Sequence, residues 1–143
     1  MLPVTLDAMY LAQTFAKYIA SNVTGKNDLE KVRQAAKIVA YYCDNSVYTN
    51  DDKDYRTPYG VLCKGVYTCS GATRTLGLVL ECMGYKWEHV NENLWSHQWC
   101  KVYMDGKVGW ADGMGGIADY GAQPPYANGG SYTNDEGVTF FVP

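Results

Sequence analysis

The chain has 143 residues, of which 47% are hydrophobic and 19% are charged, and its formal net charge at pH 7 is −3. This composition is typical of one globular domain, here residues 1–143, and excludes an intrinsically disordered chain. The negative charge gives no reason to expect nucleic acid or an anionic membrane as a partner. No apolar run approaches the length of a membrane span, and residues 1–12 lack the features of a signal peptide.

Five cysteines and two histidines limit the metal and disulfide chemistry of the chain. Without a Cys-x-x-Cys pair, no structural zinc site is expected. The odd count fits two disulfides and one working thiol, with three possible pairings, and it fits five unpaired thiols equally well. Together with 13 tyrosines, it favours an extracellular or cell-surface protein whose signal is removed or lies upstream. The four cysteines open to pairing in the first case are Cys43, Cys63, Cys82 and Cys100.

Two helices are expected in the first third of the chain. Residues 5–21 keep their apolar side chains roughly on one face. Residues 28–43 carry an apolar stripe opposite a charged face, and Asn27 is placed to cap this helix with Glu30 in the capping-box position. The polar, tyrosine-rich segment 44–67 follows, which forms either one wall of a cleft or a simple connector.

A third, buried helix is expected between Tyr67 and Gly84, with a cysteine in its first turn. Thr68 is placed to cap this helix, and Gly84 to end it. The partial positive charge of a helix N-terminus favours a thiolate, which is the nucleophilic form of cysteine. Cys69 is therefore the candidate nucleophile. The apolar positions that recur at helical spacing behind it are Ala72, Leu76, Val79, Leu80 and Met83.

Strand patterns follow this helix. Alternating side chains predict strands at 85–91, 97–104 and 107–112, and Asp105-Gly106 is a strong signal for a two-residue hairpin turn between the last two. Residues 113–137 contain seven glycines, which predicts a long irregular segment. The short apolar run at 138–142 is expected to close the edge of the sheet.

The hairpin places a histidine and an aspartate on one face. If Asp105-Gly106 is the turn, Asp112 lies opposite Trp99, and His97 lies two residues further along the same face. Diagonal neighbours of this kind are roughly 7–8 Å apart at the backbone, which an imidazole and a carboxylate can span. His97 would then take the proton of Cys69, and Asp112 would fix the imidazole tautomer. The backbone N–H of Cys69 would stabilise an oxyanion.

Other residues compete for these roles. Cys63 is the rival nucleophile, but no helix follows it. His89 lies in a strand and is more often a packed or surface residue than a base. Asp105 is explained by the turn, and Asp119 is expected in an irregular loop.

Four aromatic residues are weaker candidates for lining a substrate cleft: Tyr59, Tyr67, Trp95 and Trp99. Tyrosine and tryptophan suit half-wet surfaces, although Trp99 is equally suited to a core position.

The ordered motifs also resemble a known family. Thr68-Cys69-Ser70-Gly71-Ala72, an apolar helix ending at Gly84, His97-Gln98-Trp99 and Trp110-Ala111-Asp112 together resemble the transglutaminase-like superfamily of papain-like cysteine enzymes, over roughly residues 28–120. The resemblance implies an α+β fold, a central helix packed on an antiparallel sheet, and a triad of Cys69, His97 and Asp112. The chain departs from the family pattern in having Tyr67-Thr68 before the cysteine and Gly113, rather than proline, after Asp112.

The function expected from these motifs is acyl transfer through a thioester, without a metal or organic cofactor. Hydrolysis of amide bonds in a peptide or protein substrate, by a cysteine peptidase or amidase, is the preferred interpretation. Two alternatives remain open. One is transglutaminase crosslinking of protein glutamines to amines, and the other is a non-catalytic surface-binding module that uses the tyrosine-rich loops 44–67 and 113–137.

Overall fold

The computed structural model of the protein describes residues 4–94, 96–134, 137 and 139–141. Its mixed α+β architecture confirms the expected fold class. The helices are α1 (Val4–Asn22), α2 (Asp28–Asp44), α3 (Cys69–Cys82) and the single-turn π-helix η1 (Gly60–Lys64). The strands are β1 (Val47–Tyr48), β2 (Val66–Tyr67), β3 (Trp87–Val90), β4 (Trp99–Met104), β5 (Lys107–Asp112), β6 (Ile117–Tyr120), β7 (Ser131–Thr133) and β8 (Thr139–Phe141).

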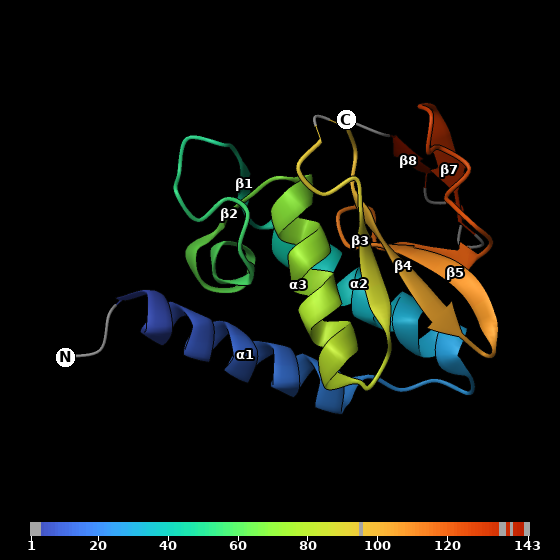
Figure 1. Cartoon of the computed structure of the whole chain (residues 1–143), viewed down its shortest axis with the longest axis horizontal. Coiled ribbons are helices and arrows are strands. Elements are labelled where there is room, and N and C mark those ends of the chain that lie inside the picture. Colours follow the sequence, from blue (N-terminus) through green and yellow to red (C-terminus); the bar gives the residue numbers. More distant parts are fainter. Residues whose placement is uncertain (1–3, 95, 135–136, 138, 142–143) are drawn as a thin grey trace.

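The main sheet is antiparallel, with the strand order β3-β4-β5-β6. Helix α3 packs against β3 and β4, and α2 packs against α3 and β6, so the two helices cover one face of the sheet (Figure 1). Helix α1 packs on the other side of α3, beside η1. A short parallel pair, β1 and β2, leads into α3, and β7 and β8 form a separate hairpin. The layers thus place the start of α3 at one end of the sheet.

A hydrophobic core joins the helices to the sheet. Its members come from α1, α2, α3, η1 and the main sheet, and include Val32, Leu76, Val79 and Val102, which are fully buried. A second, aromatic cluster lies on the side of β7 and β8 and contains Trp99, Trp110 and Tyr126. Burial of large apolar side chains is the main source of stability in such a core.

The helices confirm most of the expected ends. Asn27 caps α2, and its Oδ1 accepts from the backbone N–H of Glu30 at 2.9 Å. Helix α3 stops just before Gly84, whose φ is +90°, and the N–H of Tyr85 closes the helix on the carbonyl of Leu80 at 2.9 Å. Among the described residues, no helix has both the length and the apolar character that crossing a membrane requires.

The expected Thr68 side-chain cap is wrong. Thr68 occupies the N-cap position with an extended backbone, but its hydroxyl makes no capping hydrogen bond. Its backbone N–H donates instead to the carbonyl of Tyr55 at 3.1 Å. The chain entering α3 is thus held by the segment that follows β1 rather than by its own side chain.

The β4–β5 hairpin has the expected register. Met104 pairs with Lys107 and Cys100 with Ala111. Asp105 and Gly106 have φ values of 54° and 74°, as a two-residue type I′ turn requires. Strand β4 begins at Trp99, two residues later than expected, so His97 lies in the approach to the strand.

Two expectations for the C-terminal part are wrong. Residues 113–137 are not wholly irregular, because β6 and β7 lie within them. Strand β6 forms because Ile117 and Ala118 bury their side chains against the neighbouring layer. Strand β8 pairs with β7 instead of closing the edge of the main sheet, and Val138 and Val142 lie outside the described residues.

Candidate active site

The structure brings His97 and Asp112 into direct contact. Nε2 of His97 lies 2.5 Å from Oδ2 of Asp112, and the two side chains are only 4% and 1% exposed. Asp112 is the last residue of β5, and His97 precedes β4 by two residues. The hairpin therefore delivers the diagonal pair that its register predicts.

Asp112 is held by four hydrogen-bond donors. Its Oδ1 accepts from the backbone N–H groups of Met114 and Gly115, at 2.9 and 3.0 Å. Its Oδ2 accepts from the Tyr126 hydroxyl at 2.7 Å as well as from His97. A buried carboxylate needs such partners, since an unpaired charge in the interior is costly. This carboxylate is thus fixed in the orientation that points Oδ2 at the imidazole.

Aromatic rings surround the His97 imidazole. The ring centroids of Phe140, Tyr126 and Trp99 lie 5.6, 6.0 and 6.4 Å from its own. This burial lowers the pKa of His97. The opposite effect of Asp112 and Cys69, through hydrogen bonding and charge, outweighs it. The net effect raises the pKa of His97 to about 9. The imidazolium form is therefore strongly favoured at this position.

Cys69 is the first residue of α3 and is partly exposed. Its Sγ lies 4.0 Å from the carbonyl oxygen of Ser96, the residue before His97. Nδ1 of His97 is buried and has no hydrogen-bond partner among the described residues, while Cys69 contributes to the raised pKa of His97. The thiol thus lies close to the imidazole without a formed hydrogen bond, and Nδ1 is the nitrogen left open for it.

A cleft of about 660 Å³ opens at this point. Two other cavities, of about 460 and 90 Å³, lie away from Cys69, along β3 and between α2 and β6. The larger cleft is bordered by the segment after β1, the start of α3 and the loop between β3 and β4. Its lining residues are Tyr48, Thr49, Asn50, Tyr55, Arg56, Thr68, Cys69, Ser70, Asn93, Leu94, Ser96, His97 and Gln98.

The aromatic candidates for the cleft have other positions. Tyr67 is buried, and its ring packs edge-on against Tyr48 at 5.2 Å. Tyr59 directly precedes η1, and Trp99 is buried beside His97. Among the described residues, none of these three lines the cleft. Trp95 lies outside the described residues.

The cleft wall next to the thiol contains Tyr48 instead. Burial raises the pKa of the Tyr48 phenol, and the charge of nearby Cys69 adds to the rise. Nothing in the sequence around Tyr48 singles it out, because its place depends on the pairing of β1 with β2.

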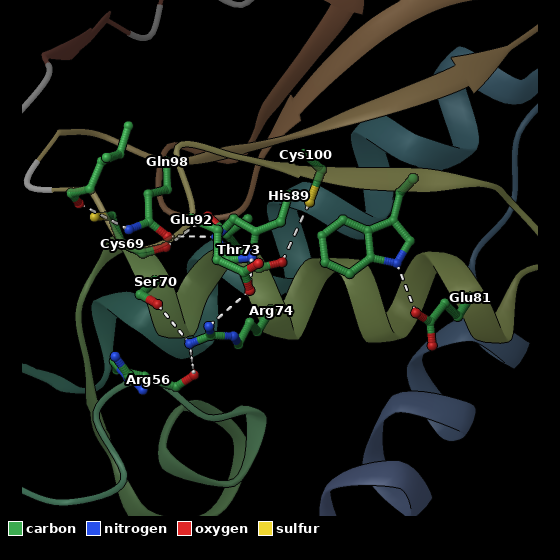
Figure 2. Close-up of polar contacts among 12 residues, drawn as sticks. Arg56, Cys69, Ser70, Thr73, Arg74, Glu81, His89, Glu92, Gln98 and Cys100 are labelled. Carbon is green, nitrogen blue, oxygen red and sulfur yellow. Dashed lines mark hydrogen bonds and ion pairs between the residues drawn. The ribbon is translucent and has the colours of Figure 1, made fainter.

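An arginine ties the walls of the cleft to α3. Nη1 of Arg74 donates to the carbonyl of Arg56 at 3.1 Å and to Oγ of Ser70 at 2.9 Å. Its Nη2 forms an ion pair of 3.0 Å with Glu92, in the loop after β3 (Figure 2). The two loops on either side of Cys69 are therefore fastened to the helix that carries it.

Two close contacts with the backbone of α3 fix this helix against the sheet near the thiol. Sγ of Cys100 lies 3.4 Å from the carbonyl oxygen of Thr73, one turn beyond Cys69. Gly113, directly after Asp112, is so near α3 that a Cβ there would lie 2.7 Å from the carbonyl oxygen of Ala72. These contacts bring the start of α3 and the end of β5 together.

The five cysteines are unpaired, which is one of the two alternatives open from the sequence. Cys43 and Cys100 are buried, and Cys63 and Cys82 are exposed. Burial raises the pKa of the Cys63 and Cys82 thiols. No histidine hydrogen-bonds to any of these four among the described residues, unlike the close approach of Cys69 to His97.

The competing acidic residues are used elsewhere. The carboxylate of Asp105 accepts from the backbone N–H groups of Asp28 and Leu29, at 3.0 and 3.1 Å, and so anchors the start of α2. Asp119 belongs to β6, not to an irregular loop, and lies 3.5 Å from Arg33.

Sequence reasoning missed Tyr126 and Phe140 as parts of the histidine environment. Tyr126 lies in the glycine-rich segment 113–137, where no periodic pattern marks a buried position. Phe140 lies in the apolar run expected at the edge of the main sheet, away from the histidine. Among the described residues, no group of three His, Cys, Asp or Glu side chains is arranged to hold a metal ion.

Comparison with models of known protein families gives no match, and a search of curated proteins finds no significantly similar sequence. Function must therefore be inferred from the geometry of the site.

Proposed function

We propose that this protein is a cysteine hydrolase that cleaves amide bonds of peptides or proteins through an acyl-enzyme, with Cys69, His97 and Asp112 as its triad. The observation that carries the proposal is the position of the His97 ring. Its Nε2 is bound to Asp112, its Nδ1 is buried and unpaired, and Cys69 lies close enough to raise the pKa of the ring. This arrangement provides a nucleophile, a base and a group that orients the base.

The reaction would proceed in two stages. His97 takes the proton of Cys69, and the thiolate attacks the substrate carbonyl carbon. The resulting oxyanion would be stabilised by the backbone N–H of Cys69, at the positive end of α3. The imidazolium then gives its proton to the leaving amine, and a thioester remains. Water, activated by His97, hydrolyses the thioester, while Asp112 stabilises the imidazolium formed in each stage.

The arrangement of elements supports a transglutaminase-like, papain-like core. In this proposal α3 is the central helix with the nucleophile at its first residue. The histidine lies in the approach to β4, and the aspartate is the last residue of β5. An open cleft with both polar and apolar lining suits an extended peptide chain. The acyl acceptor decides between hydrolysis and crosslinking, and water is the simpler acceptor because it needs no second binding site.

Alkylation kinetics test whether Cys69 is an activated nucleophile. Iodoacetamide near neutral pH should modify Cys69 faster than Cys63, an exposed cysteine of the same chain that serves as the internal reference. Peptide mapping by mass spectrometry gives both rates in one experiment. The His97→Ala substitution should bring Cys69 down to the rate of Cys63. A wild-type Cys69 that reacts no faster than Cys63 would refute the enzyme and leave a binding module.

A second assay separates the two acyl acceptors. The protein is incubated with a peptide library, and in parallel with a glutamine-containing protein and a labelled primary amine. Peptide cleavage that is lost in Cys69→Ala supports the hydrolase. Amine incorporation that depends on Cys69, without cleavage, would overturn the preference for hydrolysis in favour of crosslinking.

A further inference from the structure

Gln98 is a buried polar residue with an incompletely used side chain. It is only 5% exposed, although it lines the cleft between His97 and β4. Its Oε1 lies 2.6 Å from Nε2 of His89. Its own Nε2 has a long contact of 3.5 Å with the carbonyl of Leu94, and its second N–H has no acceptor among the described residues. The second hydrogen of this amide nitrogen is therefore free to meet an acceptor that a ligand brings into the cleft.

The position of Gln98 along the sheet places it beside Cys69. Cys100, on the same face of the chain as Gln98, contacts the carbonyl of Thr73. Gln98 lies two residues before Cys100, about 6.6 Å away in an extended chain. Cys69 lies one turn before Thr73 on α3, about 5.4–6 Å away. Both side chains line one cleft, and Figure 2 shows the Gln98 carboxamide next to Cys69.

We propose that the Gln98 carboxamide is a second oxyanion donor, acting with the backbone N–H of Cys69, and that His89 is the residue that positions it. This inference rests on the proposed acyl transfer. The two donors come from different elements, α3 and the approach to β4, and both border the cleft where a carbonyl oxygen would lie. Neither requires a proton transfer, so both are ready before the reaction begins.

His89 determines which end of the amide faces the cleft. A carboxamide has one accepting and one donating end, and the ring N–H of His89 holds the accepting end. The His89 ring is itself held in place. Its Nδ1 lies 3.5 Å from Glu92, which forms an ion pair with Arg74, and the centroid of the Trp87 ring lies 5.9 Å from that of the His89 ring. The hydrogen bond to Gln98 selects the neutral tautomer of His89 that is protonated at Nε2, and the imidazolium is protonated there as well. The Gln98 amide therefore keeps its orientation when His89 gains or loses a proton.

Two thiol reagents isolate this role, because one forms an oxyanion when it reacts and the other does not. With p-nitrophenyl acetate, the sulfur of Cys69 forms a bond to the carbonyl carbon and the thiol proton passes to His97. The carbonyl electron pair moves to oxygen, and its return expels p-nitrophenolate and leaves the acetyl thioester, which water hydrolyses. With iodoacetamide, the sulfur displaces iodide and no oxyanion forms. Only the first reaction needs the Gln98 donor.

The experiment compares both rates in the full chain and its variants. In Gln98→Ala and in the similarly shaped Gln98→Glu, whose carboxylate cannot donate, the acetylation burst should slow about 100- to 1,000-fold. Alkylation of Cys69 should stay near the wild-type rate, which also shows that the site is folded. His89→Phe should slow acetylation at least about tenfold with alkylation unchanged, and the exposed Gln13→Ala on α1 serves as the matched control.

The outcomes separate this inference from the function on which it rests. If both reagents react with wild-type Cys69 and Gln98→Ala slows neither or slows both equally, Gln98 is not an oxyanion donor, although the triad stands. If Gln98→Ala slows acetylation but not alkylation, and His89→Phe slows neither, the positioning role of His89 is refuted. If wild-type Cys69 reacts with neither reagent faster than Cys63 does, the proposed function itself fails.

Discussion

The pKa of His97 provides a direct test of the site, independent of any substrate. Asp112 and Cys69 both raise this pKa, whereas burial lowers it. Substituting Asp112→Asn removes the carboxylate charge with little change of shape. In a Cys69→Ala background, the substitution leaves burial as the remaining influence. We therefore expect a descending series from about 9 in the wild type, through Cys69→Ala, to below 6.5 in the double variant.

The size of the effect follows from the structure. A rise from the ordinary value of 6.5 to about 9 corresponds to about 3 kcal/mol in favour of the imidazolium. Because the side chain is almost fully buried, solvent screens this interaction little. Since the folded-state pKa is raised, the stabilisation is fully present below pH 6.5 and is lost as the pH rises through about 9.

NMR titration of the imidazole carbon-bound protons measures these values. The chain has two histidines, so a single His89→Gln variant assigns both signals. Burial lowers the pKa of His89, and this value should not change in Asp112→Asn, which makes His89 the internal control. A wild-type His97 that titrates at or below 6.5, or a His97 pKa indifferent to Asp112→Asn, would refute the argument.

Two further predictions concern stability in urea unfolding. Tyr126→Phe removes a buried hydrogen bond to the Asp112 carboxylate and should lower the free energy of unfolding by about 2 kcal/mol. The control Tyr10→Phe, at an exposed position on α1, should leave the free energy of unfolding unchanged. Equal effects of the two substitutions would contradict the role of Tyr126. Gly77→Ala places a Cβ 2.1 Å from the Trp87 ring and should lower the free energy of unfolding by about 1–3 kcal/mol, although alanine has the better helix propensity. The fluorescence of Trp87 should change as well. A stabilised variant would show that the ring can move aside.

The hairpin and its consequences could be predicted from the sequence because short-range chemistry dictates them. Asp105-Gly106 specifies a two-residue turn, the turn fixes the register, and the register brings His97 to Asp112. The start of α3 at Cys69 could likewise be predicted from helical spacing. The contact between this helix start and His97 could not, because it depends on packing between elements that are distant in the chain.

The remaining parts of the site carry no local pattern. Tyr126 reaches Asp112 from a glycine-rich segment, and β6 is too short to show alternation. The contact of His89 with Gln98 follows from the pairing of β3 with β4, whose connecting loop is too long to fix the register as a two-residue turn does. These features arise from tertiary packing, which composition and periodicity do not encode.

The approach of Gly113 to α3 has a consequence for how this site tolerates sequence change. The peptide backbone after Asp112 lies directly against the helix backbone at Ala72, with no room for an intervening side chain. The spacing between the thiol-bearing helix and the carboxylate-bearing strand is thus set by two main chains. Any side chain at position 113 therefore acts as a wedge that drives the two halves of the triad apart.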